Sequence, residues 1–193
     1  YRIKLLGITK RADNGIEIRV HPALIPMRRL IANVEGVMNA VLVKGDAVGP
    51  TLYYGAGAGA EPTASSVIAD LVDVTRMQTA DPMHRVPTLS FQPDSLSDTP
   101  VLAMDEVKTA YYLRLQVIDK PGVLAEITRI LADLKISISA MIQKEPGNED
   151  TVNIIILTHI TIERNINAAI TDIEALSAVT GKVTRIRIEE LNN

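Results

Sequence analysis

Hydrophobic and polar positions alternate with a period of two residues in several short segments, as in strands with one buried face. In the first half this pattern predicts strands at 2–9, 16–21, 37–44 and 48–54. The sequence Asp13-Asn14-Gly15 marks a hairpin turn between the first two strands, and Gly45-Asp46 marks the turn between the other two. Helices are predicted over 26–34 and 62–76, the second with Val67, Leu71 and Val74 on one apolar face.

The second half has a more regular pattern. Strands are predicted at 111–118, 136–142, 152–159 and 183–188, with one apolar helical stripe after the first and another after the third. In the second of these strands, Ile136, Ile138, Ala140 and Ile142 are expected on one face, and Ser137, Ser139 and Met141 on the other. A turn is predicted at 146–148. The order is β-α-β-β-α-β, which is the ferredoxin-like split pattern.

Between these halves, residues 81–105 are rich in turn-forming residues and lack periodicity. Pro82, Pro87, Pro93 and Pro100 fix the backbone and remove hydrogen-bond donors, so the stretch is expected to be a linker, with a short strand at 88–91. The predicted fold class is therefore α+β: part of a mixed-sheet domain, followed by a ferredoxin-like domain.

Composition removes several classes of function. The chain of 193 residues has no Cys, three His, 3% aromatic residues and a net charge of −3. Thiol chemistry and cysteine metal sites are excluded, and the three histidines lack ligand spacing, so no metal is expected. The net negative charge gives no positive surface potential that would attract nucleic acid or an anionic membrane. No apolar run is long enough to span a bilayer, which favours a cytoplasmic protein. The chain begins at Tyr1, without Met, inside a predicted strand, which indicates a piece of a longer protein.

A glycine-rich segment at 55–60 lies between a predicted strand and a predicted helix. It matches the dinucleotide fingerprint formally, but alternating Gly and Ala satisfy many patterns, and the second parallel strand of a Rossmann unit is not predicted. A narrower hypothesis remains: glycines allow close backbone approach, the helix N-terminus favours anions, and the Thr63 hydroxyl lies in the first turn. The alternative is a turn needed only for packing.

Other polar residues give weaker signals. For His21 a structural role is favoured over a catalytic one, and for Arg28 and Arg29 a solvated position is favoured over binding of a carboxylate. No acid–base dyad or Ser–His–Asp set is evident, so no catalytic residue is predicted.

The turn at 119–124 is more specific. Its Pro121 and Gly122 shape a tight connection from strand to helix, whose N-terminus suits a small carboxylate, while Asp119 can accept a hydrogen bond from an ammonium group. The turn is therefore a candidate amino-acid site, with a purely connecting turn as the alternative.

These residues resemble two known families. The βαββαβ order with DKPGVLA at 119–125 resembles an ACT domain. The first half resembles the C-terminal part of homoserine dehydrogenase in four segments: YRIKLLG at 1–7, HPALIP at 21–26, NVEGVMNA at 33–40 and YGAGAGAEPTASSV at 54–67. The resemblance implies the end of the substrate and dimerisation domain at 1–92, a linker at 93–108 and a regulatory ACT domain at 109–193.

The same resemblance implies the chemistry. Family members carry an NAD(P)-binding Rossmann domain, a catalytic lysine and acidic homoserine-binding residues ahead of the segment that matches Tyr1. The cofactor contacts that carry over are Gly57, Gly59 and Thr63. The ACT resemblance implies an effector site at Asp119, Pro121, Gly122, Val123 and Leu124, with threonine favoured, in a homodimer or a higher homo-oligomer.

Three classes of function are weighed. The first is part of an NAD(P)-dependent oxidoreductase that interconverts aspartate semialdehyde and homoserine, and the second is a stand-alone, non-enzymatic amino-acid sensor. The third is an RNA-binding module, because RNA-recognition domains share the βαββαβ order. It is disfavoured because the predicted strand at 152–157 has no aromatic residue for base stacking.

Overall fold

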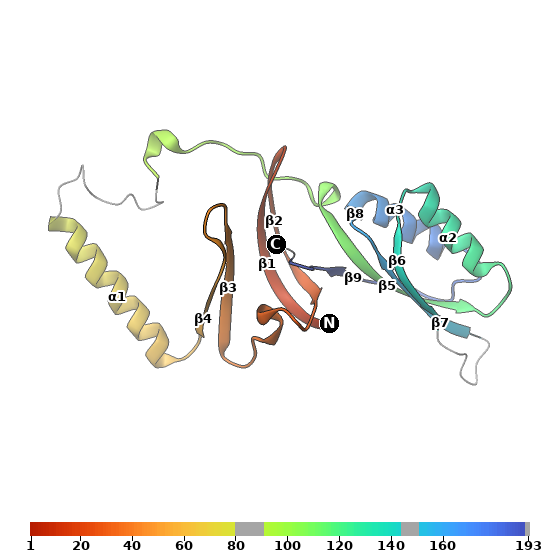
Figure 1. Cartoon of the computed structure of the whole chain (residues 1–193), viewed down its shortest axis with the longest axis horizontal. Coiled ribbons are helices and arrows are strands. Elements are labelled where there is room, and N and C mark those ends of the chain that lie inside the picture. Colours follow the sequence, from red (N-terminus) through yellow and green to blue (C-terminus); the bar gives the residue numbers. More distant parts are fainter. Residues whose placement is uncertain (80–90, 144–150, 192–193) are drawn as a thin grey trace. The chain divides into compact units, whose positions relative to one another are not determined.

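The computed structural model describes residues 1–79, 91–143 and 151–191 (Figure 1). They form two compact units. Unit 1 combines Tyr1–Arg28 with Thr99–Asn192, and unit 2 is Arg29–Asp98. The chain therefore leaves unit 1 after Arg28 and returns to it at Thr99.

Unit 1 is built on one mixed sheet with the strand order β1-β2-β9-β5-β7-β6. All neighbours in this order are antiparallel except β2 and β9, which are parallel. The short strand β8 pairs with the beginning of β5. The strands are β1 (Arg2–Ala12), β2 (Gly15–Ile25), β5 (Lys108–Ile118), β6 (Ile138–Gln143), β7 (Thr151–Thr158), β8 (Thr161–Ile162) and β9 (Thr184–Ile188).

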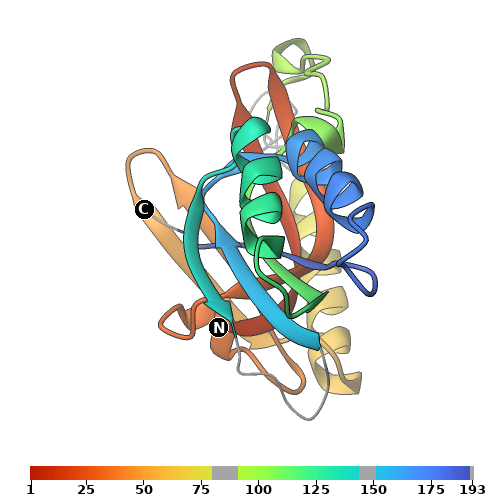
Figure 2. The same cartoon turned by 90° about the vertical axis from the view of Figure 1, so that its right-hand side faces the viewer.

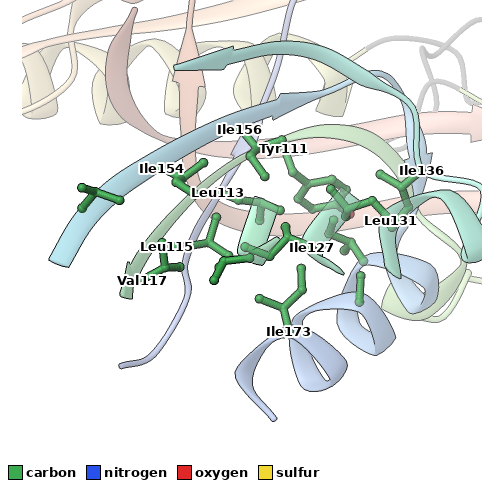
Figure 3. Packing of buried hydrophobic residues seen from close by; sticks show 14 residues of the cluster. Tyr111, Leu113, Leu115, Val117, Ile127, Leu131, Ile136, Ile154, Ile156 and Ile173 are labelled. Carbon is green, nitrogen blue, oxygen red and sulfur yellow. The ribbon is translucent and has the colours of Figure 1, made fainter. Parts of the chain in front are cut away.

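Two helices, α2 (Val123–Asp133) and α3 (Glu163–Glu174), lie side by side on one face of this sheet (Figure 2). Alternate residues of β5 and residues spaced at i and i+4 along α2 meet in a dry core. Figure 3 shows the packing, in which Leu113, Leu115, Ile127, Leu131 and Ile173 are fully buried. The predicted ferredoxin-like βαββαβ order is confirmed over this part of the chain.

One face assignment was wrong in β6. The pairing with β7 shifts between Ile138 and Ala140, which leaves Ser139 as an extra residue in the strand. Because a one-residue slip moves every following side chain to the opposite face, Met141 packs against the core and Ile142 is 53% exposed. Strict alternation had predicted the reverse for these two residues.

The hairpin of β1 and β2 extends the ferredoxin-like sheet through β9. The parallel contact pairs Ala23 with Arg187 and Leu24 with Ile188, and the Glu189 N–H donates to Leu24 O at 2.9 Å. Near the hairpin turn, Ile16 N–H donates to Pro100 O at 2.9 Å. Both β1–β2 and the turn at 13–15 agree with the sequence prediction.

Over 17–21 the hairpin buries polar residues and exposes apolar ones, whereas Ala23 and Ile25 further along β2 are fully buried. Along β2 the buried positions include Glu17, Arg19 and His21, whereas Ile18 and Val20 are 53% and 72% exposed. On the paired strand β1, Ile3 and Leu5 are 59% and 72% exposed. The strand period of two is kept, but over 17–21 the usual relation between polarity and burial is inverted.

Unit 2 consists of a second hairpin, β3 (Met38–Gly45) with β4 (Gly49–Ala56), followed by helix α1 (Ala60–Thr79). These elements were predicted at nearly the same positions. Helix α1 has no buried residue, and its apolar positions Val67, Leu71 and Val74 are 52%, 57% and 49% exposed. The amphipathic face of α1 is therefore not covered by the described residues of unit 2.

The helix predicted over 26–34 was wrong. The segment contains only a 3-10 turn, Leu30–Asn33, flanked by extended residues Arg29 and Val34. The Asn33 amide donates to Arg29 O at 3.0 Å, which closes the turn locally, and Gly36 then adopts a φ of +66°. A side-chain bond of this kind competes with continuation of a helix.

The predicted linker is partly structured. It contains the 3-10 turns Pro93–Ser95 and Met104–Glu106, and Val101 forms a parallel bridge with Ile16. The predicted strand at 88–91 and the turn at 146–148 fall largely or wholly outside the described residues. The division of the chain into domains at 1–92, 93–108 and 109–193 stays a prediction.

Candidate functional site

The glycine-rich loop of unit 2 connects β4 to the N-terminus of α1. Gly57 N–H donates to Val37 O at 3.3 Å, which fixes the loop to the start of β3. Gly59 has a φ of +126°, a conformation that side chains other than glycine rarely adopt. Thr63 N–H donates to Gly59 O at 3.2 Å, so the three predicted cofactor residues lie together at one helix N-terminus.

The chemistry available at this loop is that of an exposed anion site. The N–H groups of the first helical turn and the positive end of the helix dipole attract negative charge. Pro62 suits the first turn because it has no N–H to leave unsatisfied, whereas Glu61 in the same turn opposes an anion. All residues from Gly55 to Glu61 are exposed, so the loop is open to a ligand.

The second predicted site, the turn at 119–124, lies in unit 1 between β5 and α2. Asp119, Pro121 and Gly122 are exposed, while Val123 is buried and Leu124 packs partly against the core. Gly122 is the N-cap of α2, with a φ of +96° and no side-chain cap. The sequence had placed the helix start near Pro121, and the observed helix begins at Val123.

The donors at this turn are partly used. Glu126 N–H donates to Gly122 O at 3.0 Å, and Val123 N–H makes a long bond of 3.4 Å to Lys120 O. The N–H groups of Leu124 and Ala125 are the remaining first-turn donors, because a helix leaves its first N–H groups without helical acceptors. The turn therefore offers backbone donors beside the exposed Asp119 carboxylate.

A buried ionic cluster within the ferredoxin-like part joins β5, α3 and β9. Glu163 accepts a hydrogen bond of 2.6 Å from the Tyr111 hydroxyl and pairs with Arg187 through both carboxylate oxygens. Arg185 lies 3.2 Å from the same carboxylate. Burial raises the pKa of the Glu163 carboxyl, but the bonds from Arg187 and Tyr111 outweigh it, and the net pKa is lowered. Burial and Glu163 raise the pKa of Tyr111.

A second buried cluster joins the hairpin to β9. Arg19 Nη1 donates to Glu189 Oε1 at 2.6 Å, and the Arg19 side chain is 1% exposed. Lys10 Nζ lies 3.3 Å from the other Glu189 oxygen, and the Thr109 hydroxyl lies 3.4 Å from Oε1. Glu189 therefore receives groups from β1, β2 and β5.

His21 completes this cluster. Its Nε2 lies 2.9 Å from Arg19 Nη1, and since arginine only donates, Nε2 must accept. The proton then lies on Nδ1, which donates to Pro22 O at 3.0 Å. Burial lowers the pKa of His21, and the charges of Arg187 and Arg19 lower it further. His21 thus has the buried, hydrogen-bonded environment of a structural histidine.

The sequence analysis missed Arg19, Glu189 and Glu163. Its weighing of Arg28 fits the structure better, because Arg28 is exposed and pairs with Glu190 at 2.7 Å. The signal for Arg19 was the alternation of Glu17, Arg19 and His21, which is equally typical of a solvated strand face. Within the described residues, no group of three or more His, Cys, Asp or Glu could hold a metal ion, and no helix is long and apolar enough to cross a membrane.

These features define the class of protein: an α+β chain in which a ferredoxin-like domain of the ACT type is joined to a separate unit that carries a glycine-rich loop. Residues 1–72 match the family model for homoserine dehydrogenase, and residues 111–178 match that for the ACT domain. The chain belongs to the homoserine dehydrogenase family, as a C-terminal region with an ACT domain.

Individual relatives agree with this assignment. The homoserine dehydrogenase of Pseudomonas aeruginosa is 60% identical over 193 residues, which is 100% of this chain and 44% of that protein. That of Neisseria gonorrhoeae is 54% identical, with the same coverage. The crystal structure of a homoserine dehydrogenase from Thiobacillus denitrificans superposes with a TM-score of 0.91 at 72% identity, covering 100% of this chain and 43% of that chain. The chain thus spans less than half the length of these relatives.

Proposed function

We propose that this chain is the substrate-domain end and the regulatory domain of an enzyme that interconverts L-homoserine and L-aspartate 4-semialdehyde with NAD(P). The observation that carries the proposal is the match of both of its parts, in family order, to homoserine dehydrogenases. The nicotinamide cofactor would supply the hydride, and the protein would position it against the carbonyl. As a biosynthetic enzyme of this family, the protein is expected in the cytoplasm.

In this proposal the Gly57–Gly59 loop and Thr63 contact the cofactor. The left-handed Gly59 and the adjoining N-terminus of α1 support an anionic or strongly polar ligand group there. We expect Gly59→Ala in the longer enzyme to raise the KM for NAD(P) because a Cβ strains the loop. Gly55→Ala is the matched control, since nothing lies within 4 Å of its Cβ position. An equal effect of both substitutions would contradict the assignment.

The 193 residues alone are proposed to be inactive, because the cofactor domain, the catalytic lysine and the acidic substrate residues of the family have no counterpart in them. The assay is homoserine-dependent reduction of NAD⁺ or NADP⁺ by the purified chain. Turnover would disprove this part of the proposal. The open reading frame upstream of Tyr1 separates the enzyme from the stand-alone sensor, since a sensor needs no dinucleotide-binding domain.

The ACT half is proposed to bind a small amino acid, with threonine favoured, at Asp119, Pro121, Gly122, Val123 and Leu124. The donors of the first turn of α2 suit a carboxylate, and Asp119 suits an ammonium group. Isothermal titration with threonine, isoleucine, methionine and serine tests the proposal. We expect Asp119→Ala to weaken binding about tenfold or more, since hydrogen bonds to charged groups contribute roughly 1.5–3 kcal/mol. Asp133→Ala, at the exposed far end of α2, is the matched control.

Self-association into a homodimer or a higher homo-oligomer is also proposed. Val41 and Val43 on one face of β3, and Leu42 on the other, are 60%, 46% and 38% exposed, and the apolar positions of α1 add to this surface. Exposed apolar area of this kind favours association. Light scattering at micromolar concentration is the test, and a monomer would contradict this proposal.

A further inference from the structure

The β1–β2 hairpin belongs to two parts of the protein at once. By sequence it lies within residues 1–72, which match the homoserine dehydrogenase family. By packing it lies in unit 1, where it continues the ACT sheet through β9. Its chain runs directly from β2 through Arg28 into unit 2, so the hairpin is covalently continuous with one part and non-covalently fixed to the other.

The backbone contact that fixes the hairpin is short. Strands β2 and β9 share only the pairs Ala23–Arg187 and Leu24–Ile188, whereas β5 and β7 pair from Tyr112 to Ile118. The backbone bonds between Ile16 and residues 100 and 102, and the buried side chains Ala23 and Ile25, add to this short ladder, and ion pairs supply a further attachment. The outer apolar face of the hairpin cannot do this, because Leu5 and Val20 are each 72% exposed.

Glu189 supplies that attachment. Its carboxylate is 4% exposed and receives Arg19 at 2.6 Å and Lys10 at 3.3 Å from the hairpin, and it lies 3.4 Å from the Thr109 hydroxyl of β5, which also donates to Ile188 O at 2.9 Å. Within the described residues, Arg19 Nε and Nη2 make no hydrogen bond. Glu17 lies 3.5 Å from Arg19 Nε, so Glu189 is the carboxylate that accepts a hydrogen bond from the buried guanidinium, and without it that charge keeps only the longer pair to Glu17, which is unfavourable for a buried charge.

From this geometry we infer that the β1–β2 hairpin transmits conformational change between the ACT domain and the homoserine dehydrogenase part, with Glu189 as the positioning residue that locks it to the ACT sheet. The regulatory meaning of this coupling rests on the proposed function, whereas the mechanical coupling does not. A displacement of β9 or β5 is carried to Arg19 and Lys10 through one carboxylate, and then along β2 to Arg28.

Hydrogen exchange on the whole chain tests the lock directly. In the wild type the amides of β2 should open only together with those of β5, as parts of one cooperative unit. In Glu189→Gln the exchange of β2 should rise about tenfold or more while β7 is unchanged, since each factor of ten corresponds to about 1.4 kcal/mol. Glu174→Gln is the matched control, because Glu174 pairs with Lys182 at 2.6 Å inside the ACT part. Unchanged exchange of β2 in Glu189→Gln would overturn the inference.

Transmission is tested by weakening the ACT core at a distance. Leu131→Ala should accelerate exchange in β5 and in β2 by the same factor, because the lock makes them open together. In the double variant with Glu189→Gln, the exchange of β2 should no longer follow the Leu131 substitution. If the hydrogen-exchange rate of β2 is unchanged in the single variant Leu131→Ala, transmission is contradicted, whether or not any amino acid binds.

A ligand arm separates this inference from the proposed function. If threonine binds by titration, it should protect β2 amides in the wild type and not in Glu189→Gln, with similar affinity for both. Binding without protection of β2 would contradict the inference, while absence of binding would count only against the proposed effector, and the exchange results above would still decide the coupling.

Discussion

The two units of this chain use the same kinds of element and stabilise them differently. In unit 1, alternating residues of β5 and β7 and the stripes of α2 and α3 converge on a core in which Leu115, Ile127 and Ile154 are 1% exposed or less. In unit 2, helix α1 has no buried residue, and Val41 and Tyr53 of the β3–β4 hairpin are 60% and 65% exposed. Local hydrogen bonds are present in both units, but among the described residues an extensive core is found in unit 1 alone.

This difference indicates that unit 1 provides most of the folding stability and that unit 2 provides apolar surface for contact with other protein. An isolated two-stranded hairpin is marginal in water, and an uncovered amphipathic helix gains little from its apolar face. Unit 2 is therefore expected to gain stability from further protein surface, whereas unit 1 is expected to fold on its own contacts. The variants below test this comparison by placing matched changes in both units.

The largest effect is expected from the buried carboxylate of unit 1. Glu163→Ala leaves Arg187 and the Tyr111 hydroxyl without their partner in the protein interior, which should cost about 3–5 kcal/mol in urea unfolding. The matched change in unit 2 is Asp73→Ala, because Asp73 pairs with Arg76 at 3.6 Å while both are about 70% exposed or more. That loss should stay within about 1 kcal/mol. Similar losses at both sites would remove the distinction between the units.

The second-largest loss of stability is expected from substitution of a core leucine in unit 1. Leu131→Ala should destabilise the chain by about 2–5 kcal/mol, because it removes a fully buried side chain and leaves a cavity. At concentrations too low for self-association, Leu71→Ala on α1 should change stability by less than about 0.5 kcal/mol, because Leu71 is 57% exposed in the single chain and alanine is a strong helix former. A large effect of Leu71→Ala would show that α1 is covered in solution, and its dependence on protein concentration would identify self-association as the cause.

Glycines with positive φ give a smaller effect in both units. Gly122→Ala and Gly59→Ala each place a Cβ on a backbone with φ of +96° and +126°, at a cost of about 1–2 kcal/mol. In unit 1 the cost should appear in the global unfolding transition measured by circular dichroism. In unit 2 it should appear as faster local exchange around residues 57–63, with the global midpoint unchanged. A shift of the global midpoint by Gly59→Ala would mean that the two units unfold together.

The smallest expected effect is a pH dependence that belongs to unit 1. The pKa of His21 is lowered in the folded state by burial, so the unfolded state binds more protons as the pH falls below the ordinary value near 6.5. Stability should therefore decline from pH 6.5 downward, and His21→Gln should flatten the decline in that range. Loss from Glu163, whose pKa is also lowered, should begin only below about 4.5 and should persist in His21→Gln. An unchanged profile in His21→Gln would contradict the prediction.

Much of the fold could be predicted because it is written in local patterns. The turn at Asp13-Asn14-Gly15, the stripe of α2 and the alternation of β5 depend on near neighbours in the sequence. The failures have physical causes that extend beyond the pattern. The bulge at Ser139 moves Met141 to the core face, and the Asn33 bond to Arg29 O replaces the helix expected over 26–34.

The candidate sites were predictable where the backbone itself forms the site, as at Gly59 and Gly122. The buried clusters were not, because polarity alone does not distinguish a solvated strand face from one that meets a partner. The short ion pair of the buried Arg19 is with Glu189, which lies 170 residues further along the chain. No window of neighbouring residues contains that information.

This separation also has a consequence in time. A hairpin such as β1–β2 forms within microseconds, but a ribosome adding about 5–20 residues per second needs roughly 10–30 s to travel the 170 residues from Arg19 to Glu189. Throughout that interval, the face that carries Glu17, Arg19 and His21 remains solvated, which avoids the free-energy cost of burying its charged groups without partners. Docking of the hairpin onto β9 must therefore wait until Glu189 has been synthesised, long after the hairpin itself has formed.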